Sequence, residues 1–135
     1  MSALICGSIA FDTIMVYSGQ FKNEILPDQV HMLNVSFLVP DMRREFGGCA
    51  GNIAYSLALL GGQGQAMATV GKDFDDYGDW MAEHGISRDY IKVIDDAYTA
   101  QAYITTDLDD NQITAFHPGA MNHAHEQSVP ADAGI

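Results

Sequence analysis

The chain has 135 residues, of which 47% are hydrophobic and 18% are charged. This composition excludes a disordered chain and fits one compact domain with a sizeable core. With 18 acidic residues against 6 basic ones, the formal net charge is −12. Such a charge disfavours binding to nucleic acid or to an anionic membrane surface, and it leaves small-molecule ligands open.

The two cysteines, Cys6 and Cys49, are too few for a disulfide framework, so we expect reduced thiols. The N-terminal residues carry no basic segment of the kind that opens a secretory signal. No apolar run approaches the roughly 18 residues of a membrane span. These features together predict a cytoplasmic protein.

The first forty residues predict strands followed by an excursion. Residues 3–9 form a short apolar run that predicts a buried strand, with Gly7 allowing close backbone approach, and residues 13–17 continue the extended pattern. Residues 21–40 show no helical period. Within them, the alternation over residues 31–39 predicts one exposed strand in a flap that leaves the main sheet.

The middle of the chain predicts alternating helices and strands. Small and apolar residues over 53–60 predict a helix that is buried on most sides and ended by Gly61 and Gly62. Residues 65–70 predict a second core strand, and residues 90–94 a short one. Between these strands, residues 74–84 predict an amphipathic helix that is capped by Asp73 and ended by Gly85.

Two β-rich segments, residues 99–106 and 112–117, flank a polar turn and predict a β-hairpin. The alternation of strands and helices before it predicts an α/β fold with a mostly parallel sheet. Acidic residues concentrate between positions 72 and 110, and we interpret them as a solvated outer face.

Two local features are candidates for a binding site. The segment Gly47-Gly48-Cys49-Ala50-Gly51-Asn52 opens the first helix, where glycines and free helix N–H groups suit hydroxyls or an anion. Asp12 follows the first strand, at the rim where α/β sheets bind ligands. Each feature has an alternative interpretation: a tight turn with close helix packing for the first, and a turn-forming Asp for the second.

No metal site is predicted. The spacing of Asp107, Asp109 and Asn111 imitates the start of a calcium loop, but the required Gly and bidentate Glu are missing. His117, His123 and His125 lack a Cys or Glu at metal-ligand spacing. No Rossmann or P-loop glycine motif is present either.

Several segments, in the same order, resemble the ribokinase-like (pfkB-type) sugar and nucleoside kinases, and most closely the microbial adenosine and nucleoside kinases. They are residues 4–12, 47–54, 59–61, 69–73 with Gly78, 99–106 and 111–120. The resemblance implies that residues 1–135 are the N-terminal part of a ribokinase-like three-layer α/β sandwich. It also implies a small β-sheet lid, with strands at approximately 13–40 and 99–117.

The resemblance assigns substrate-binding roles to seven residues. Asp12 would accept hydrogen bonds from sugar hydroxyls, and the same ring would be bound by the backbone of Gly47 and Gly48 together with the Asn52 side chain. Three residues on the later hairpin would face the sugar or base: Ala102, Ile104 and Phe116.

The implied activity is transfer of a phosphoryl group from ATP, with Mg²⁺, to a primary hydroxyl of a nucleoside (adenosine) or a sugar. The family takes its general base and phosphoryl-binding helix from a Gly-Ala-Gly-Asp segment, and these 135 residues contain none. We therefore assign no catalytic residue, and expect the isolated chain to be inactive and not to bind ATP tightly. The alternatives are a ribokinase- or fructokinase-type sugar kinase, a non-catalytic nucleoside-binding module, or a module that forms a homodimer through the lid strands.

Overall fold

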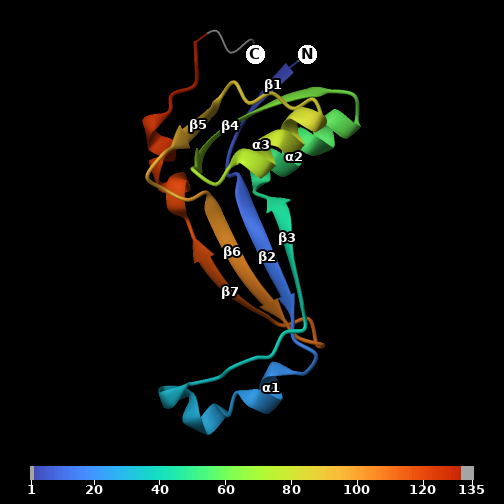
Figure 1. Ribbon diagram of the computed structural model, residues 1–135, viewed down its shortest axis with the longest axis vertical. Coiled ribbons are helices and arrows are strands. Elements are labelled where there is room, and N and C mark those ends of the chain that lie inside the picture. Colours follow the sequence, from blue (N-terminus) through green and yellow to red (C-terminus); the bar gives the residue numbers. More distant parts are fainter. Residues whose placement is uncertain (1, 132–135) are drawn as a thin grey trace.

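The computed structural model describes residues 2–131 and is elongated, with two sheets and an arm following one another along its long axis (Figure 1). The first sheet is parallel and has three strands in the order β1-β4-β5. They are β1 (Ser2–Cys6), β4 (Gln63–Gly71) and β5 (Ile91–Ile94). We call this sheet, with the helices packed on it, the body.

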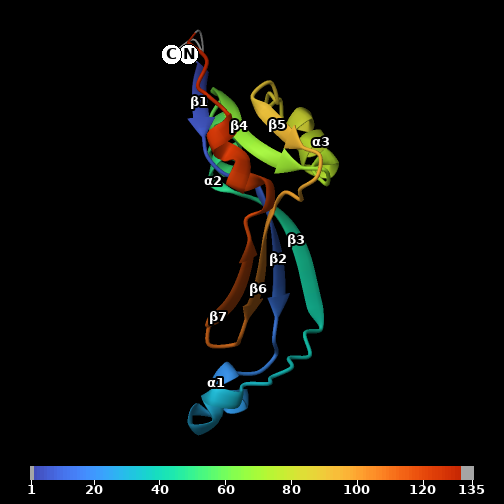
Figure 2. The same cartoon turned by 90° about the vertical axis from the view of Figure 1, so that its left-hand side faces the viewer.

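Helices cover both faces of the body's sheet (Figure 2). Helices α2 (Cys49–Leu59) and α3 (Asp75–Glu83) lie on one face, and the 3₁₀ helix η2 (Gly119–Glu126) lies on the other. Successive side chains of β4 point to opposite faces of the sheet, so they contact the helices on both faces. Ala66, Ala68 and Val70 join the core with α2 and α3, whereas the Thr69 hydroxyl donates to the Ala120 carbonyl of η2 over 2.6 Å.

The second sheet has four strands in the order β3-β2-β6-β7. They are β2 (Ala10–Val16), β3 (Asp41–Gly47), β6 (Ala100–Thr106) and β7 (Gln112–His117). Strands β2 and β6 are parallel, while the other two pairs are antiparallel. The predicted hairpin is confirmed as β6 and β7, and the α/β class with a parallel sheet is confirmed by the body.

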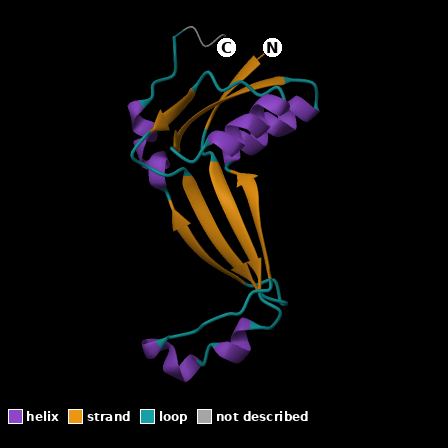
Figure 3. Cartoon of the chain, in the orientation of Figure 1, coloured by secondary structure: helices purple, strands orange, loops and turns teal. Residues whose placement is uncertain are grey.

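Residues 20–40 form an arm beyond the far end of the four-stranded sheet (Figures 1 and 3). It contains α1 (Phe21–Glu24) and the 3₁₀ helix η1 (Pro27–Met32), and the rest of it is irregular. The strand predicted over residues 31–39 is therefore wrong. No strand within residues 2–131 pairs with this segment, and the next strand, β3, begins only at Asp41.

The prediction that the first helix is buried on most sides is also wrong. In α2 only Ala50, Gly51 and Ala54 are buried, whereas Ile53 is 52% exposed and Leu60, just past its end, is 84% exposed. One stripe of the helix packs on the sheet, and no other described element covers its outer side. No helix within residues 2–131 has the length and apolar character needed to cross a membrane.

Asp73 does not cap α3 as predicted. The capping position is Phe74, and it makes no side-chain capping bond. The Asp73 carboxylate instead accepts hydrogen bonds from the Thr99 N–H at 2.7 Å and from the Gln101 Nε2 at 3.1 Å. Asp73 therefore connects the body to strand β6.

Candidate functional site

The glycine-rich turn joins the four-stranded sheet to α2. Gly47 ends β3, and Gly48 precedes α2 with a φ of +91°. A Cβ on Gly48 would lie 2.7 Å from the Ile9 Cα, so this position needs glycine for its conformation and for its close packing. The turn is thus pressed against the connection between β1 and β2.

The first amides of α2 are already occupied. The Ser8 hydroxyl accepts from the Cys49 N–H at 3.1 Å, and the Ser8 carbonyl accepts from the Ala50 N–H at 3.0 Å. The expectation that the free N–H groups of this helix end bind a ligand therefore does not apply to Cys49 and Ala50. Ser8 was not singled out from the sequence, although its place directly after β1 and Gly7 is a usable signal.

The Cys49 thiol is exposed and free, as is Cys6. The Cys49 Sγ lies 3.4 Å from the Ser8 backbone N and 3.5 Å from the Ser8 Oγ. Hydrogen bonds from the Ser8 hydroxyl and the Ser8 N–H lower the pKa of the Cys49 thiol.

Asp12 lies in a row of residues that crosses three strands. It pairs with Ala102 on β6, and Ala102 pairs with Phe116 on β7, so the three side chains share one face of the sheet. Partial burial raises the pKa of the Asp12 carboxyl above its ordinary value. A Cβ on Gly47 would lie 2.9 Å from the Asp12 Cγ, so the glycine leaves the space beside this carboxyl open.

The remaining sequence-predicted residues lie around this row. Ile104 is two residues beyond Ala102 on the same face, where it pairs with Ile14 of β2. Phe116 is 52% exposed, whereas Ala102 is buried. Asn52 is an exposed residue in the first turn of α2, and its backbone N–H donates to the Gly48 carbonyl at 3.0 Å.

The opposite face of the four-stranded sheet is attached to the body. Phe11 of β2 and Phe46 of β3 pack on Tyr77 of α3, with ring centroids 5.7 and 4.7 Å from that of Tyr77. The Arg44 guanidinium lies 3.6 Å from the centroid of Phe11, and its Nη2 is 3.8 Å from the Asp73 Oδ2. These contacts attach one face of β2 and β3 to the body, and the Asp12 side chain lies on the other face.

Tyr77 is a second residue that sequence reasoning missed. It is fully buried, and its hydroxyl donates to the Gly47 carbonyl over 2.9 Å. Burial, and then the nearby charge of Asp12, raise the pKa of Tyr77 to about 12. Nothing in the local sequence marks it, because its partner lies thirty residues earlier.

The acidic residues whose spacing imitates a calcium loop lie in the turn between β6 and β7, where Asp107 accepts hydrogen bonds within the turn. Asp107 is buried, and its carboxylate accepts hydrogen bonds from the Phe21, Asp109 and Asn111 N–H groups. Within the described residues 2–131, no three His, Cys, Asp or Glu side chains gather closely enough to hold a metal ion.

An α/β body carrying a small β-sheet, with an acid beside a glycine turn at their junction, fits the N-terminal part of the ribokinase-like fold that the motifs predicted. The model of the pfkB family of carbohydrate kinases matches residues 9–133. The chain belongs to this family, which confirms the resemblance inferred from its motifs.

Several of the proteins similar to this chain are named nucleoside kinases. The chain is 32% identical over 124 residues to the nucleoside kinase of Methanothermobacter thermautotrophicus, covering 90% of this chain and 40% of that protein. The Burkholderia thailandensis nucleoside kinase in complex with inosine superposes with a TM-score of 0.81 at 58% identity, covering 93% of this chain and 39% of that one. The Methanocaldococcus jannaschii nucleoside kinase superposes with a TM-score of 0.80 at 30% identity, and the match covers 96% of this chain and 40% of that one. The chain therefore spans about 40% of the length of these relatives.

Proposed function

We propose that this chain binds a nucleoside on the face of the four-stranded sheet that carries Asp12, as the acceptor-binding part of a nucleoside kinase. The observation that carries the proposal is the row Asp12, Ala102 and Phe116, which lies beside the turn Gly47-Gly48. The Burkholderia protein, which is similar over nearly all of this chain, has been solved with inosine and also with ADP-inosine.

The chemistry of the row suits a ribose joined to a flat base. The Asp12 carboxyl accepts hydrogen bonds from two neighbouring hydroxyls, and the open space at Gly47 admits the sugar ring next to it. Asn52 supplies a further donor and acceptor from α2. Phe116 and Ile104 offer apolar surface to the base, and an aromatic contact of this kind contributes about 0.5–1.5 kcal/mol beyond its buried area.

The full kinase reaction requires groups that this chain does not contain. Transfer of a phosphoryl group from Mg²⁺-bound ATP needs a base on the acceptor hydroxyl and donors for the phosphoryl oxygens. The 135 residues have no Gly-Ala-Gly-Asp segment and no phosphate-binding glycine loop of the P-loop type. The described residues also hold no metal-ligand cluster. We therefore assign ATP and Mg²⁺ no residues here, and propose that the isolated chain binds a nucleoside without phosphorylating it.

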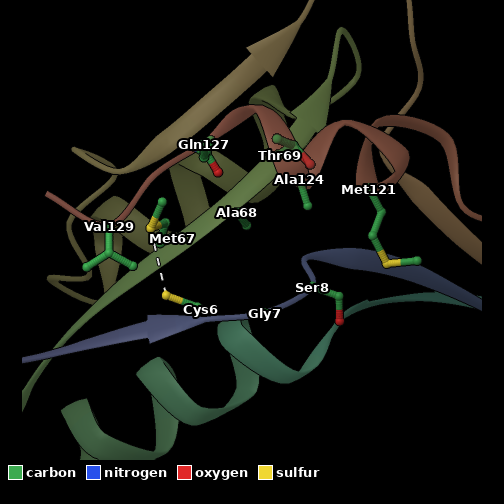
Figure 4. A pocket seen from close by; sticks show the side chains of 10 residues that line it. All are labelled: Cys6, Gly7, Ser8, Met67, Ala68, Thr69, Met121, Ala124, Gln127 and Val129. Carbon is green, nitrogen blue, oxygen red and sulfur yellow. Dashed lines mark hydrogen bonds between the residues drawn. The ribbon is translucent and has the colours of Figure 1, made fainter.

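The remaining part of a full-length kinase would be accommodated beside β1. Among the described residues 2–131, β1 pairs with β4 alone, so its other edge is available for a further strand. A cavity of about 390 Å³ adjoins it, lined by residues that include Cys6, Met67, Met121 and Val129 (Figure 4). A free strand edge next to apolar side chains fits a further strand and its connecting helix.

Calorimetry on the purified chain tests the binding proposal. Adenosine and inosine are expected to bind, ribose more weakly because it lacks the base, and Asp12→Ala is expected to abolish the signal. The matched control is Asp95→Ala, which removes an exposed acid from the turn after β5 and should leave binding unchanged. Failure of both nucleosides to bind at millimolar concentration contradicts the proposal, and preference for ribose or fructose alone favours a sugar kinase.

A coupled assay for ADP tests the predicted lack of turnover. With adenosine and Mg²⁺-ATP, the chain is expected to give no more ADP than a control without adenosine. Robust adenosine-dependent ADP production would overturn the inactivity and require a base among these residues.

A second candidate role is self-association through the arm. Five of its apolar side chains are more than half exposed: Leu26, Val30, Met32, Leu33 and Leu38. Exposed apolar surface of this kind is typical of a protein contact. Sedimentation at several concentrations tests it, and a strict monomer excludes it.

A further inference from the structure

Tyr77 lies directly beneath the glycine-rich turn, although it belongs to α3. Its ring is enclosed by Phe11, Phe46, Phe74 and Trp80, with centroid separations between 4.7 and 5.8 Å. A phenyl ring would fill this space equally well. The hydroxyl is therefore the part that needs an explanation, and it makes one contact with the site, donating to the Gly47 carbonyl over 2.9 Å.

This hydrogen bond sets the direction of the neighbouring N–H. The peptide between Gly47 and Gly48 is planar and trans, so its C=O and N–H point to opposite sides. With the Gly47 carbonyl held toward Tyr77 in the core, the Gly48 N–H is directed away from it. Among the described residues, the Gly48 N–H donates to no other group.

Gly51 makes room for the hydroxyl. It is a buried residue of α2, and a Cβ at this position would overlap the Tyr77 hydroxyl oxygen and lie 3.1 Å from the Tyr77 Cζ. Glycine is a poorer helix former than alanine, so α2 carries an unfavourable residue at the one place where the hydroxyl needs space. The pair Gly51 and Tyr77 is thus matched in shape across two helices.

We infer that Tyr77 is a positioning residue of the nucleoside site: its hydroxyl holds the Gly47 carbonyl in the core and so presents the Gly48 N–H to the ligand beside Asp12. This inference rests on the proposed function. Tyr77 does not touch the ligand, and acts only through the orientation of one peptide group. A donor that is already oriented loses little freedom on binding, which is why a distant hydroxyl affects affinity.

Tyr77→Phe is the direct test, because it removes the hydroxyl and keeps the ring. The affinity for adenosine and inosine in calorimetry is expected to fall about tenfold, the scale of one lost hydrogen bond. In NMR, the Gly48 amide signal should shift on nucleoside addition in the wild type and not in the variant. The matched control is Tyr55→Phe, which removes a hydroxyl from the same aromatic cluster, where Tyr55 packs on Trp80, and should keep wild-type affinity.

Gly51→Ala is the second test, because it displaces the hydroxyl while Tyr77 stays in place. Alone it should weaken nucleoside binding as Tyr77→Phe does. In the Tyr77→Phe background its further effect on affinity should be smaller, since the oxygen that the methyl group would overlap is gone and only a tight contact with the ring Cζ at 3.1 Å remains. Such non-additivity is the signature of two side chains that act through one contact.

The outcomes separate the two claims. If the wild type binds no nucleoside, the proposed function fails and the positioning role fails with it. If the wild type binds and Tyr77→Phe binds equally well, the positioning role alone is overturned. Should Tyr77→Phe not fold, Gly51→Ala decides, and unchanged affinity in that variant overturns the inference.

Discussion

The body and the arm both contain large apolar side chains, but they differ in how these side chains are covered. In and around the body, Phe11, Tyr77 and Met81 are completely buried, whereas Leu38 and Met32 in the arm are 87% and 75% exposed. The body places two helices on one face of a sheet and a third on the other, while in the arm only Phe21 is buried, where it packs against Tyr17 and Phe37. Close packing fixes groups such as the Gly47 carbonyl in the body, whereas most side chains of the arm have no packed neighbour to hold them.

The four-stranded sheet is joined to the body at one end and to the arm at the other, and polar contacts contribute to both junctions. Asp73 connects the body to β6 and, through Arg44, to β3. At the far end of the four-stranded sheet, Asp107 connects the β6-β7 turn to the start of the arm. We therefore expect the largest losses of stability from buried side chains of the body, and smaller losses from the polar contacts at the two junctions.

The largest contrast is expected between two methionines. Met81→Ala removes a fully buried side chain from α3 and should lower the free energy of unfolding by about 2–5 kcal/mol. Met32→Ala makes the same change in the arm and should alter it by no more than about 0.5 kcal/mol. Urea unfolding followed by circular dichroism measures both. Equal losses would mean that a partner surface covers the arm.

Asp73→Ala tests the junction with the body. The Thr99 N–H is completely buried, and without Asp73 it has no acceptor. An unsatisfied buried donor costs about 1–3 kcal/mol, so the unfolding free energy should fall by that amount. Asp96→Ala, at an exposed acid in the turn after β5, is the control and should be near neutral. A neutral Asp73→Ala would show that water replaces the carboxylate.

The effect expected at Asp107 depends on pH. Burial raises the pKa of this carboxyl, but hydrogen bonds from Phe21, Asn111 and Asp109 outweigh it and lower the pKa from 3.8 to about 2. Since the folded-state pKa is depressed, the stabilisation is present above about pH 4 and is lost as the pH falls through about 2.

Thermal unfolding between about pH 5 and pH 2 measures this dependence. The wild type should lose more stability over this range than Asp107→Asn, which has no carboxyl to titrate. Asp110→Asn is the control in the same turn, because Asn tolerates its positive φ of 60°, and it should follow the wild type. Identical pH profiles for Asp107→Asn and the wild type would contradict the depressed pKa.

Local sequence patterns predicted the elements that have local causes. The hairpin followed from β-rich segments around a polar turn, and the end of α3 followed from Gly85, which has a φ of +68°. The strand over 31–39 was wrong because alternation describes a side-chain pattern and does not supply a hydrogen-bonding neighbour. The burial of α2 was overestimated for a similar reason, since apolar residues such as Leu60 do not reveal how many sides will be covered.

By itself, the sequence determined the family, the α/β class and the candidate residues Asp12, Gly47 and Gly48. These depend on motifs in a fixed order and on turns that need glycine, and both are visible in neighbouring residues. Only the tertiary structure decided which groups meet. The contacts of Tyr77 with Gly47 and Gly51, and of Ser8 with Cys49, join residues that lie 26 to 41 positions apart. Such contacts arise from the packing of helices on sheets, a property that no local pattern contains.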